Sequence, residues 1–280
     1  ATSPWPRHWM SPEAEDPQRH PHAHTHGSDH TADSAGFPWA GRSFEANPFA
    51  GDDGSADPAL IGAIERFRAG DAAVVEVTDA YRSARLLIPL VAEKGDEGVG
   101  AHGLTVDKTQ ELSIVTVAAP DGRRVLPVFS SVAAMGAWDP AARPVPADGV
   151  RTAAAAVDDG TDLIVLDPGS ETEFVIRRPA VWAIAQGQAW EPAHTSPEVF
   201  AGFQESIGAE LAVLDLSLAS ADPQARGRGP EVQVQLDIMP GLDREELDAM
   251  LQRLAKRWAA DDRIAVLVDS LAVKIRRSSV

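Results

Sequence analysis

From about residue 57 onward, apolar residues recur at the spacing of helices and strands. Asp57 and Pro58 have the residue types that begin a helix, apolar residues follow at intervals of three and four, and Gly70 is suited to end it. Residues 72–84 fit two structures, because their valines favour a strand while their apolar positions also share one helical face. We predict a helix there, since residues 86–91 form the better strand.

The next segments predict a strand, a loop and a hairpin. Pro89 cannot donate to a strand ladder, which predicts an edge position or a bulge. Residues 93–110 are rich in glycine and charge and are interpreted as a loop. Residues 112–118 alternate between apolar and polar positions, a Pro-Asp-Gly turn follows, and residues 125–129 return as the second strand of the clearest hairpin in the chain.

A helix and a second hairpin follow that first hairpin. Either Ser130 or Ser131 can cap the next helix, which runs through Trp138. The remaining elements of this region are an Ala-rich helix at 150–157, strands at 162–166 and 172–176 around the turn Asp167-Pro168-Gly169, and a short helix at 179–186.

The last 85 residues or so predict a second group of helices and strands. Ser196 is expected to cap a helix, and Asp243 with Glu246 has the spacing of a capping box. Strictly alternating residues at 231–238 predict a strand with one wet face. The other expected elements are strands at 211–218, 264–268 and 271–275, a polar loop at 222–230, and a helix that continues from the capping box to Trp258.

Composition narrows the class of protein. The chain has 280 residues, of which 44% are hydrophobic and 24% charged, as in globular proteins. Its net charge of −17 argues against general binding to nucleic acids or anionic membranes, because phosphate affinity comes from lysine and arginine. The absence of cysteine excludes disulfides and Cys-based metal sites, and no apolar run approaches the ~20 residues of a membrane span. We therefore expect a soluble protein of the cytoplasm.

Residues 1–56 form a leader rich in proline, glycine, serine, aspartate and histidine, without apolar periodicity. Such a segment cannot bury enough apolar surface to offset chain entropy, so we predict disorder. Imidazoles at the spacing found here can chelate Zn²⁺ or Ni²⁺, but neither cysteine nor arranged carboxylates accompany them, and no metal site is predicted. The histidines of the leader are His8, His20, His22, His24, His26 and His30.

The chain lacks the common signatures of catalysis. It contains no Gly-x-Ser-x-Gly motif, no phosphate-binding loop and no dinucleotide-binding glycine motif. Beyond the leader the only histidines are His102 and His194, both in expected loops, and neither is predicted as a site residue. No catalytic residue, metal site or cofactor is predicted, and the protein is expected not to be an enzyme.

The order of these elements resembles a known family. A strand with a central proline at 86–91, a hairpin into Leu-Pro-Val-Phe-Ser-Ser at 126–131, an Ala-rich helix, and Leu-Ile-Val-Leu-Asp-Pro-Gly-Ser at 163–170 together resemble the SseB family, named for enhanced serine sensitivity, in particular its actinobacterial members. The resemblance covers roughly residues 57–278. One departure is Asp167, where many relatives are expected to have asparagine, a residue equally suited to that turn.

The resemblance implies a fold but no reaction. We expect an α+β (mixed α/β) protein with two small sheet-plus-helix domains after the disordered leader: an SseB N-terminal-like domain at 57–188 and a C-terminal domain at 196–280. Three functions stay open, of which the third is metal handling through the His-rich leader. The first is a non-enzymatic module that binds a protein partner and no nucleic acid or membrane. The second is an amino-acid sensor or an enzyme linked to serine metabolism, whose candidate ligand-binding residues are Phe129, Ser130, Ser131, Asp167, Gly169 and Ser170.

Overall fold

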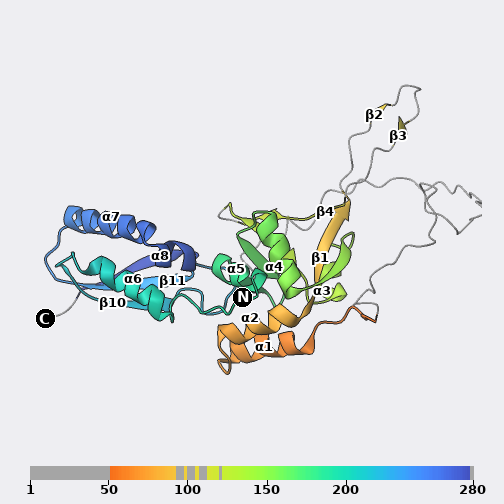
Figure 1. Cartoon of the computed structure of the whole chain (residues 1–280), viewed down its shortest axis with the longest axis horizontal. Coiled ribbons are helices and arrows are strands. Elements are labelled where there is room, and N and C mark those ends of the chain that lie inside the picture. The colour runs from red at the N-terminus through yellow and green to blue at the C-terminus, as the bar shows by residue number, and fades with distance from the viewer. Residues whose placement is uncertain (1–50, 93–97, 100–104, 107–111, 120–121, 278–280) are drawn as a thin grey trace, which may run out of the picture. The chain divides into compact units, whose positions relative to one another are not determined.

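The computed structural model describes residues 51–92, 98–99, 105–106, 112–119 and 122–277 (Figure 1). The described residues from Gly54 onward belong to one compact unit of mixed helices and strands, which confirms the predicted fold class. Residues 1–50 of the leader, with its six histidines, lie outside the described residues, as does His102. The two predictions for the leader, that it is disordered and that it holds no metal site, therefore stay predictions.

The first half of the unit extends from Gly54 to the helix that ends at Ala185. Its elements, in chain order, are α1 (Pro58–Ala69), α2 (Val74–Ser83), β1 (Arg85–Ala92), β2 (Gly98–Val99), β3 (Thr105–Val106), β4 (Leu112–Ile114), β5 (Val117–Ala118), β6 (Arg124–Val128), α3 (Val132–Trp138), β7 (Arg143–Asp148), α4 (Gly149–Asp158), β8 (Leu163–Leu166), β9 (Phe174–Arg177) and α5 (Arg178–Ala185).

The first two helices begin and end as predicted. The Asp57 carboxylate accepts a hydrogen bond from the backbone of α1, and Gly70 ends this helix in the left-handed region at φ 83°. The ambiguous segment is the helix α2, whose residues Val77 and Tyr81 are buried on one face. Burial of that face outweighs the strand preference of its valines, because propensities are weaker than the free energy of apolar burial.

The prediction that Pro89 lies at a sheet edge or bulge is wrong. Strand β1 is the centre of the antiparallel sheet β4-β1-β7, and its pairing with β7 continues without a register shift through Pro89, which lies opposite Pro144. The position of the missing N–H explains this. Backbone groups of alternate residues point to the same side, and the N–H of Leu87 points away from β7, toward Phe129. On that side the neighbour of β1 is Phe129 at Leu87 and β4 from Leu90 onward. The missing N–H of Pro89 therefore lies between these two neighbours and does not interrupt the pairing with β7.

The predicted hairpin is confirmed in part. Strands β5 and β6 pair antiparallel, with Val117 opposite Val125, in the four-stranded sheet β5-β6-β8-β9. The predicted single strand at 112–118 is divided, however, because β4 pairs with β1 in the other sheet. The last residues of β1 pair with β4, so that only β5 remains to pair with β6. A single bridge joins the two sheets, in which Leu87 and Phe129 exchange backbone hydrogen bonds of 2.8 and 2.9 Å.

Helices α1, α2, α4 and α5 contribute to the main core of this half together with both sheets. Tyr81, Leu126, Phe174 and Ile184 are among its buried side chains. The contact between α2 and α4 is especially close: a Cβ on Gly149 would lie 2.0 Å from the Tyr81 carbonyl oxygen. The absence of a side chain at this position therefore lets the two helices meet.

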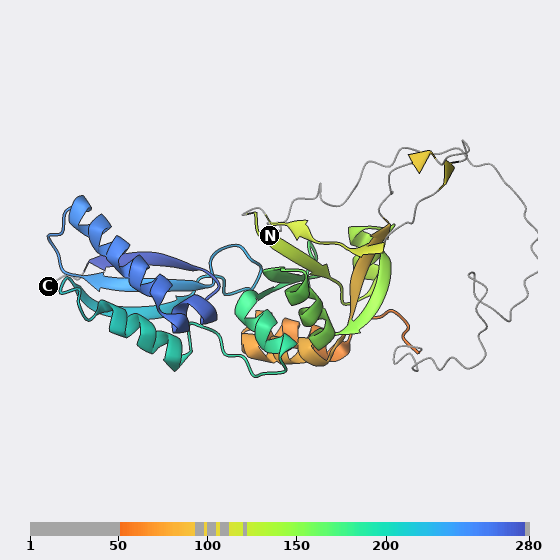
Figure 2. The same ribbon diagram turned by 45° about the horizontal axis from the view of Figure 1, so that its top comes forward.

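The second half of the unit has its own core, built on the sheet β10-β11-β12. Figures 1 and 2 show helices lying against this sheet. In β11, the central strand, the side chains of alternate residues from Val232 to Ile238 are buried, so the predicted one-sided strand is confirmed. The elements are α6 (Pro197–Ile207), β10 (Val213–Ser220), β11 (Val232–Ile238), α7 (Arg244–Ala260), α8 (Asp262–Leu267) and β12 (Leu271–Arg277).

The predicted strand at 264–268 is wrong, because these residues belong largely to helix α8. The side chain of Asp261 accepts a hydrogen bond from the Arg263 backbone N–H and pairs with the Arg263 guanidinium at 2.6 Å, which starts a helix. Ile264 is buried within the core of the second half. The Asp261 cap therefore outweighs the strand preference of the β-branched residues. Together α7 and α8 form the crossover connection that the parallel strands β11 and β12 require.

The helix caps of the second half are confirmed in one case and altered in another. Asp243 and Glu246 form the predicted capping box at the start of α7. Ser196 occupies the predicted cap position of α6, but its side chain makes no capping hydrogen bond.

Candidate binding site

The structure brings together two of the predicted site residues, Ser130 and Asp167. One Asp167 carboxylate oxygen accepts from the Ser130 backbone N–H at 2.8 Å, and the other accepts from the Ser130 hydroxyl at 2.7 Å. The Thr172 hydroxyl donates to the same carboxylate at 2.7 Å. Ser130 is 3% exposed and Asp167 1% exposed. Their polar groups therefore bond to each other in the interior and bridge the end of β6 to the turn after β8.

The other predicted residues also make internal contacts. Phe129 is buried against Trp138, with ring centroids 5.2 Å apart, and Ser131 caps α3 through a 3.1 Å bond from the Ala134 backbone N–H. The Gly169 backbone N–H donates to the Glu173 carboxylate at 2.7 Å, while the Ser170 hydroxyl lies 2.9 Å from that of Thr172. A ligand-binding role for the six residues stays a prediction. A cleft in another part of the protein is the candidate binding site.

A cleft lies where α2, the segment after α5 and the end of β10 meet. Its outer part has a volume of about 470 Å³ and is lined by Phe67, Val75 and Glu191 among others, and its inner recess of about 50 Å³ reaches Arg177 and Glu231. The two parts are contiguous because they share lining residues. The shared residues are Val74, Trp190, Pro192, His194, Ser220 and Asp222.

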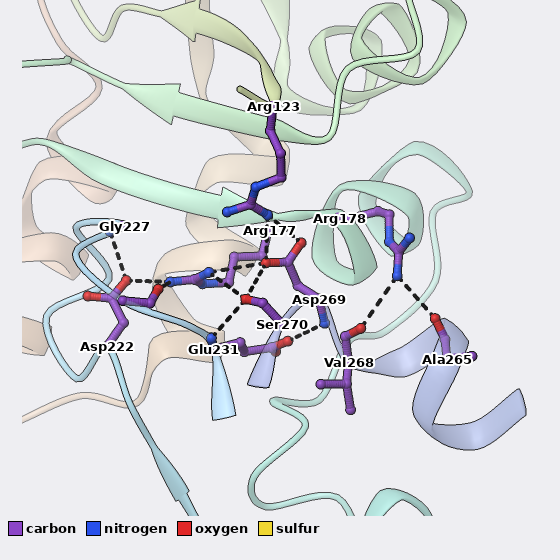
Figure 3. A network of polar contacts seen from close by, with 11 residues as sticks. Arg123, Arg177, Arg178, Asp222, Gly227, Glu231, Ala265, Val268, Asp269 and Ser270 are labelled. Carbon is purple, nitrogen blue, oxygen red and sulfur yellow. Dashed lines mark hydrogen bonds and ion pairs between the residues drawn. The ribbon is translucent and has the colours of Figure 1, made fainter. Parts of the chain in front are cut away.

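A buried ionic network forms the polar end of this cleft (Figure 3). Arg177, the last residue of β9, lies 2.7 Å from the Asp222 carboxylate and 3.1 Å from that of Asp269, and it also donates to the Gly229 carbonyl oxygen at 2.8 Å. Arg123 binds the same Asp269 carboxylate at 2.9 Å. Arg123 just before β6 and Arg177 at the end of β9 thus join the first half of the unit to the second. Their partners lie in two loops, Asp222 after β10 and Asp269 before β12.

The loop that carries Asp222 also extends the sheet of the first half. Strand β9 is an edge strand, and its Val175 backbone N–H donates to the Ala225 carbonyl oxygen at 2.7 Å. Ala225 adopts a left-handed backbone conformation at φ 49° and is counted among the core residues of the first half. The guanidinium of Arg226 follows and donates to the carbonyl oxygens of Ser170 and Glu171. The loop therefore covers the outer edge of β9.

Three carboxylates of the network share two guanidinium groups, because the third arginine in Figure 3, Arg178, donates to the carbonyl oxygens of Ala265 and Val268. Arg123 and Arg177 face Asp222, Asp269 and the buried Glu231, whose carboxylate accepts from the Asp269 backbone N–H at 2.6 Å. Burial raises the pKa of Glu231 to about 7, although backbone hydrogen bonds from Asp269 and Ala193 act in the opposite direction. A low dielectric surrounding disfavours the surplus negative charge, which a proton on Glu231 removes.

Two further groups of the cleft carry hydrogen-bonding capacity. Burial lowers the pKa of His194, so that its imidazole is neutral near pH 7. The indole Nε1 of Trp190 is buried without a hydrogen-bond partner among the residues that the structure describes. An unpaired buried donor of this kind lowers the stability of the fold.

Sequence reasoning missed this site because its parts are far apart in the chain. Arg177, Asp222 and Asp269 are each more than 40 residues from one another, and no motif relates them. Only Trp190 and His194 are close in sequence, and a tryptophan with a histidine in a proline-containing linker is a weak signal. Within the described part of the chain, no group of three metal-ligating side chains occurs, and no helix there is long and apolar enough to cross a membrane.

Comparison with known proteins identifies one domain. Residues 60–183 match the family model of the SseB protein N-terminal domain, which spans the chain from α1 into α5. The search of curated proteins and the search of solved structures each gave no match.

Proposed function

Since its match over residues 60–183 makes the chain a member of the SseB family, we propose that it is a non-enzymatic protein-interaction module. Its proposed binding site is the cleft lined by Trp190 and His194, and its proposed partner is a protein segment that inserts a side chain there. The observation that carries this proposal is the cleft itself, which combines an apolar wall with the polar groups of Ser220 and His194.

The size and lining of the cleft support binding. A volume of about 470 Å³ lies in the range of sites that hold small ligands or inserted side chains. Phe67, Val74 and Pro192 provide apolar contact, while Ser220 and His194 offer a few polar groups that orient a bound chain.

The chemistry of the network supports a structural role for its charges. Asp222 and Asp269 are both held by arginine, and Asp222 also accepts from the Gly227 backbone N–H at 2.8 Å. The lone pairs of carboxylates bound in this way are occupied by arginine and backbone donors, whereas a general base needs a free lone pair next to its substrate. Burial of Ser130 and Asp167 likewise gives no support to the alternative of a serine-linked sensor or enzyme at that place.

We further propose domain boundaries at residues 57–188 and 196–280, supported by two cores that lie within these ranges except for Ala225, which packs in the first core, and Ala193, which packs in the second. A cytoplasmic location is proposed because the 280 residues contain no cysteine, which fits a reducing compartment.

Site-specific photo-crosslinking tests the proposed function. We would introduce p-benzoylphenylalanine at Val75, on the wall of the cleft, and as a control at Asp248, an exposed position on α7. The expected result in native host cells is a discrete crosslinked species from position 75 alone, which disappears when Val74→Asp places a charge on the apolar wall. Identical crosslinking patterns from positions 75 and 248 would overturn the proposal.

A further inference from the structure

We propose that the partner segment inserts a lysine side chain into the cleft, with its ammonium group in the inner recess beside Glu231 and His194 and its alkyl stem along Val74 and Trp190. This inference rests on the proposed function, since it specifies the chemistry of the partner at the same site. Size, charge and hydrogen-bonding capacity of the lining residues carry it.

The dimensions of the two parts of the cleft fit this side chain. The inner recess of about 50 Å³ has room for an ammonium group, since a site for one water molecule needs only about 10–15 Å³. An ammonium is a compact point charge on a flexible stem, which suits a recess behind an apolar wall. The outer part of about 470 Å³ holds the alkyl stem and a neighbouring apolar residue against Phe67, Val74 and Val75.

The charge of the lining residues favours a cation. Glu191, Asp222 and Glu231 line the two parts of the cleft, and Arg177 is the one arginine or lysine among the lining residues. That guanidinium is already bound to the carboxylates of Asp222 and Asp269. A ligand ammonium would supply the positive charge that the buried network lacks.

The available hydrogen-bond acceptors also suit an ammonium, which has three donors and no acceptor. The Glu231 carboxylate, the unprotonated ring nitrogen of His194 and the Ser220 hydroxyl all belong to residues that line the recess. The face of the Trp190 ring adds an attractive surface for a cation and its alkyl stem.

Protonation of Glu231 would then compete with the ligand. The charged or titratable groups around it are Arg177 on β9, Asp269 before β12, Asp222 after β10 and His194 in the linker. Because burial raises the pKa of Glu231 to about 7, its carboxylate is largely protonated at pH 6 and largely ionised at pH 8. Lysine binding should therefore strengthen over this interval.

Titration with blocked peptides, followed by NMR, tests the inference. The probe is acetyl-Leu-Lys-Leu-amide, and its matched control is the same peptide with norleucine, which has an uncharged stem. The readout is the indole N–H signal of Trp190, assigned with a Trp190→Phe variant. At pH 8 we expect the lysine peptide to bind about tenfold more tightly than the norleucine peptide, the usual effect of one charge-assisted hydrogen bond.

Two comparisons make the test specific to Glu231. In Glu231→Gln the preference for lysine should fall to less than about twofold, whereas Glu198→Gln, which removes an acid lining a different groove, should leave it unchanged. For the wild-type protein the preference should decrease from pH 8 to pH 6, which keeps the test valid if Glu231→Gln does not fold.

Each other outcome would overturn the inference. Equal binding of the two peptides would reject the lysine and leave the protein-interaction function standing. Binding of n-butylamine as tight as that of the lysine peptide would assign the recess to a small amine instead of a protein segment. Absence of any change at Trp190 would reject lysine insertion, and the crosslinking experiment would then decide separately on the proposed function.

Discussion

Removing the guanidinium of Arg177 should destabilise the protein far more than removing an exposed arginine. The Arg177 side chain is 8% exposed, and those of its partners Asp222 and Asp269 are 5% and 3% exposed. Arg177→Met leaves two buried carboxylates with less positive charge, and only Arg123 still faces Asp269. Breaking a buried ion pair in this way costs about 3–5 kcal/mol.

The matched control is Arg124→Met. Arg124 lies 2.8 Å from Asp159, close to the distance found for Arg177, but these two side chains are 52% and 38% exposed. Water screens such a pair, so its loss costs at most about 1 kcal/mol. For a unit of this size, the corresponding decrease in melting temperature is about 6–20 °C for Arg177→Met and less than about 4 °C for Arg124→Met.

Urea unfolding followed by tryptophan fluorescence measures both variants. Trp138 lies in a core of the first half and Trp258 in the core of the second, so single-tryptophan variants report on each half. We expect Arg177→Met to separate the two transitions, because the network joins the halves. Adding Asp222→Asn and Asp269→Asn to Arg177→Met should recover part of the stability, since the uncompensated charges are then gone. If Arg177→Met and Arg124→Met have the same effect, the reasoning from burial is refuted.

Three further predictions follow from other contacts. Asp167→Ala should lower the free energy of unfolding by about 3–5 kcal/mol, because it leaves the Ser130 and Thr172 donors unpaired in the interior, whereas Asp167→Asn should cost less than half as much; equal losses in calorimetry would contradict this. Glu231 has a folded-state pKa raised from 4.5 to about 7, so the stability that it contributes is complete below pH 4.5 and is lost as the pH rises through 7. Relative to Glu231→Gln, the wild-type protein should therefore lose roughly 3 kcal/mol between pH 4.5 and pH 8, and parallel pH profiles of the two proteins would reject the assignment. Gly149→Ala should destabilise by at least about 1–3 kcal/mol in thermal unfolding, because its methyl group would overlap the Tyr81 carbonyl, while Gly136→Ala, with open space around it, should be neutral or stabilising.

Local sequence signals predicted most of the individual elements, for physical reasons that differ between sites. The capping box of Asp243 and Glu246 and the alternation in β11 are short-range patterns with a direct structural cause. Residues 264–268 misled the prediction because their β-branched side chains favour a strand, while the cap of Asp261 lies just outside the apolar run. Periodicity alone cannot distinguish a short buried helix from a short strand.

Pro89 and the candidate site show what local patterns cannot reveal. Whether a proline disturbs a sheet depends on which neighbour its missing N–H faces, and that neighbour is set by the pairing of Leu87 with Phe129. Arg177 likewise gives no sign in the sequence of its buried partners, since Asp222 and Asp269 reach it through the tertiary fold. The predicted pair Ser130 and Asp167 was brought together, but as donor and acceptor to each other.

The loop between β10 and β11, which contains Ala225, determines whether the first half can be produced as a separate fragment. A fragment that ends near residue 188 would keep the four-stranded sheet but lose the carbonyl oxygen that receives the Val175 N–H. Strand β9 would then present an open edge of buried apolar residues beside an unpaired Arg177. Open edges of this kind recruit strands from other molecules, so the fragment should aggregate at concentrations at which the whole chain stays monodisperse. By covering the edge of β9, the loop from the second half thus prevents edge-to-edge association of the first half.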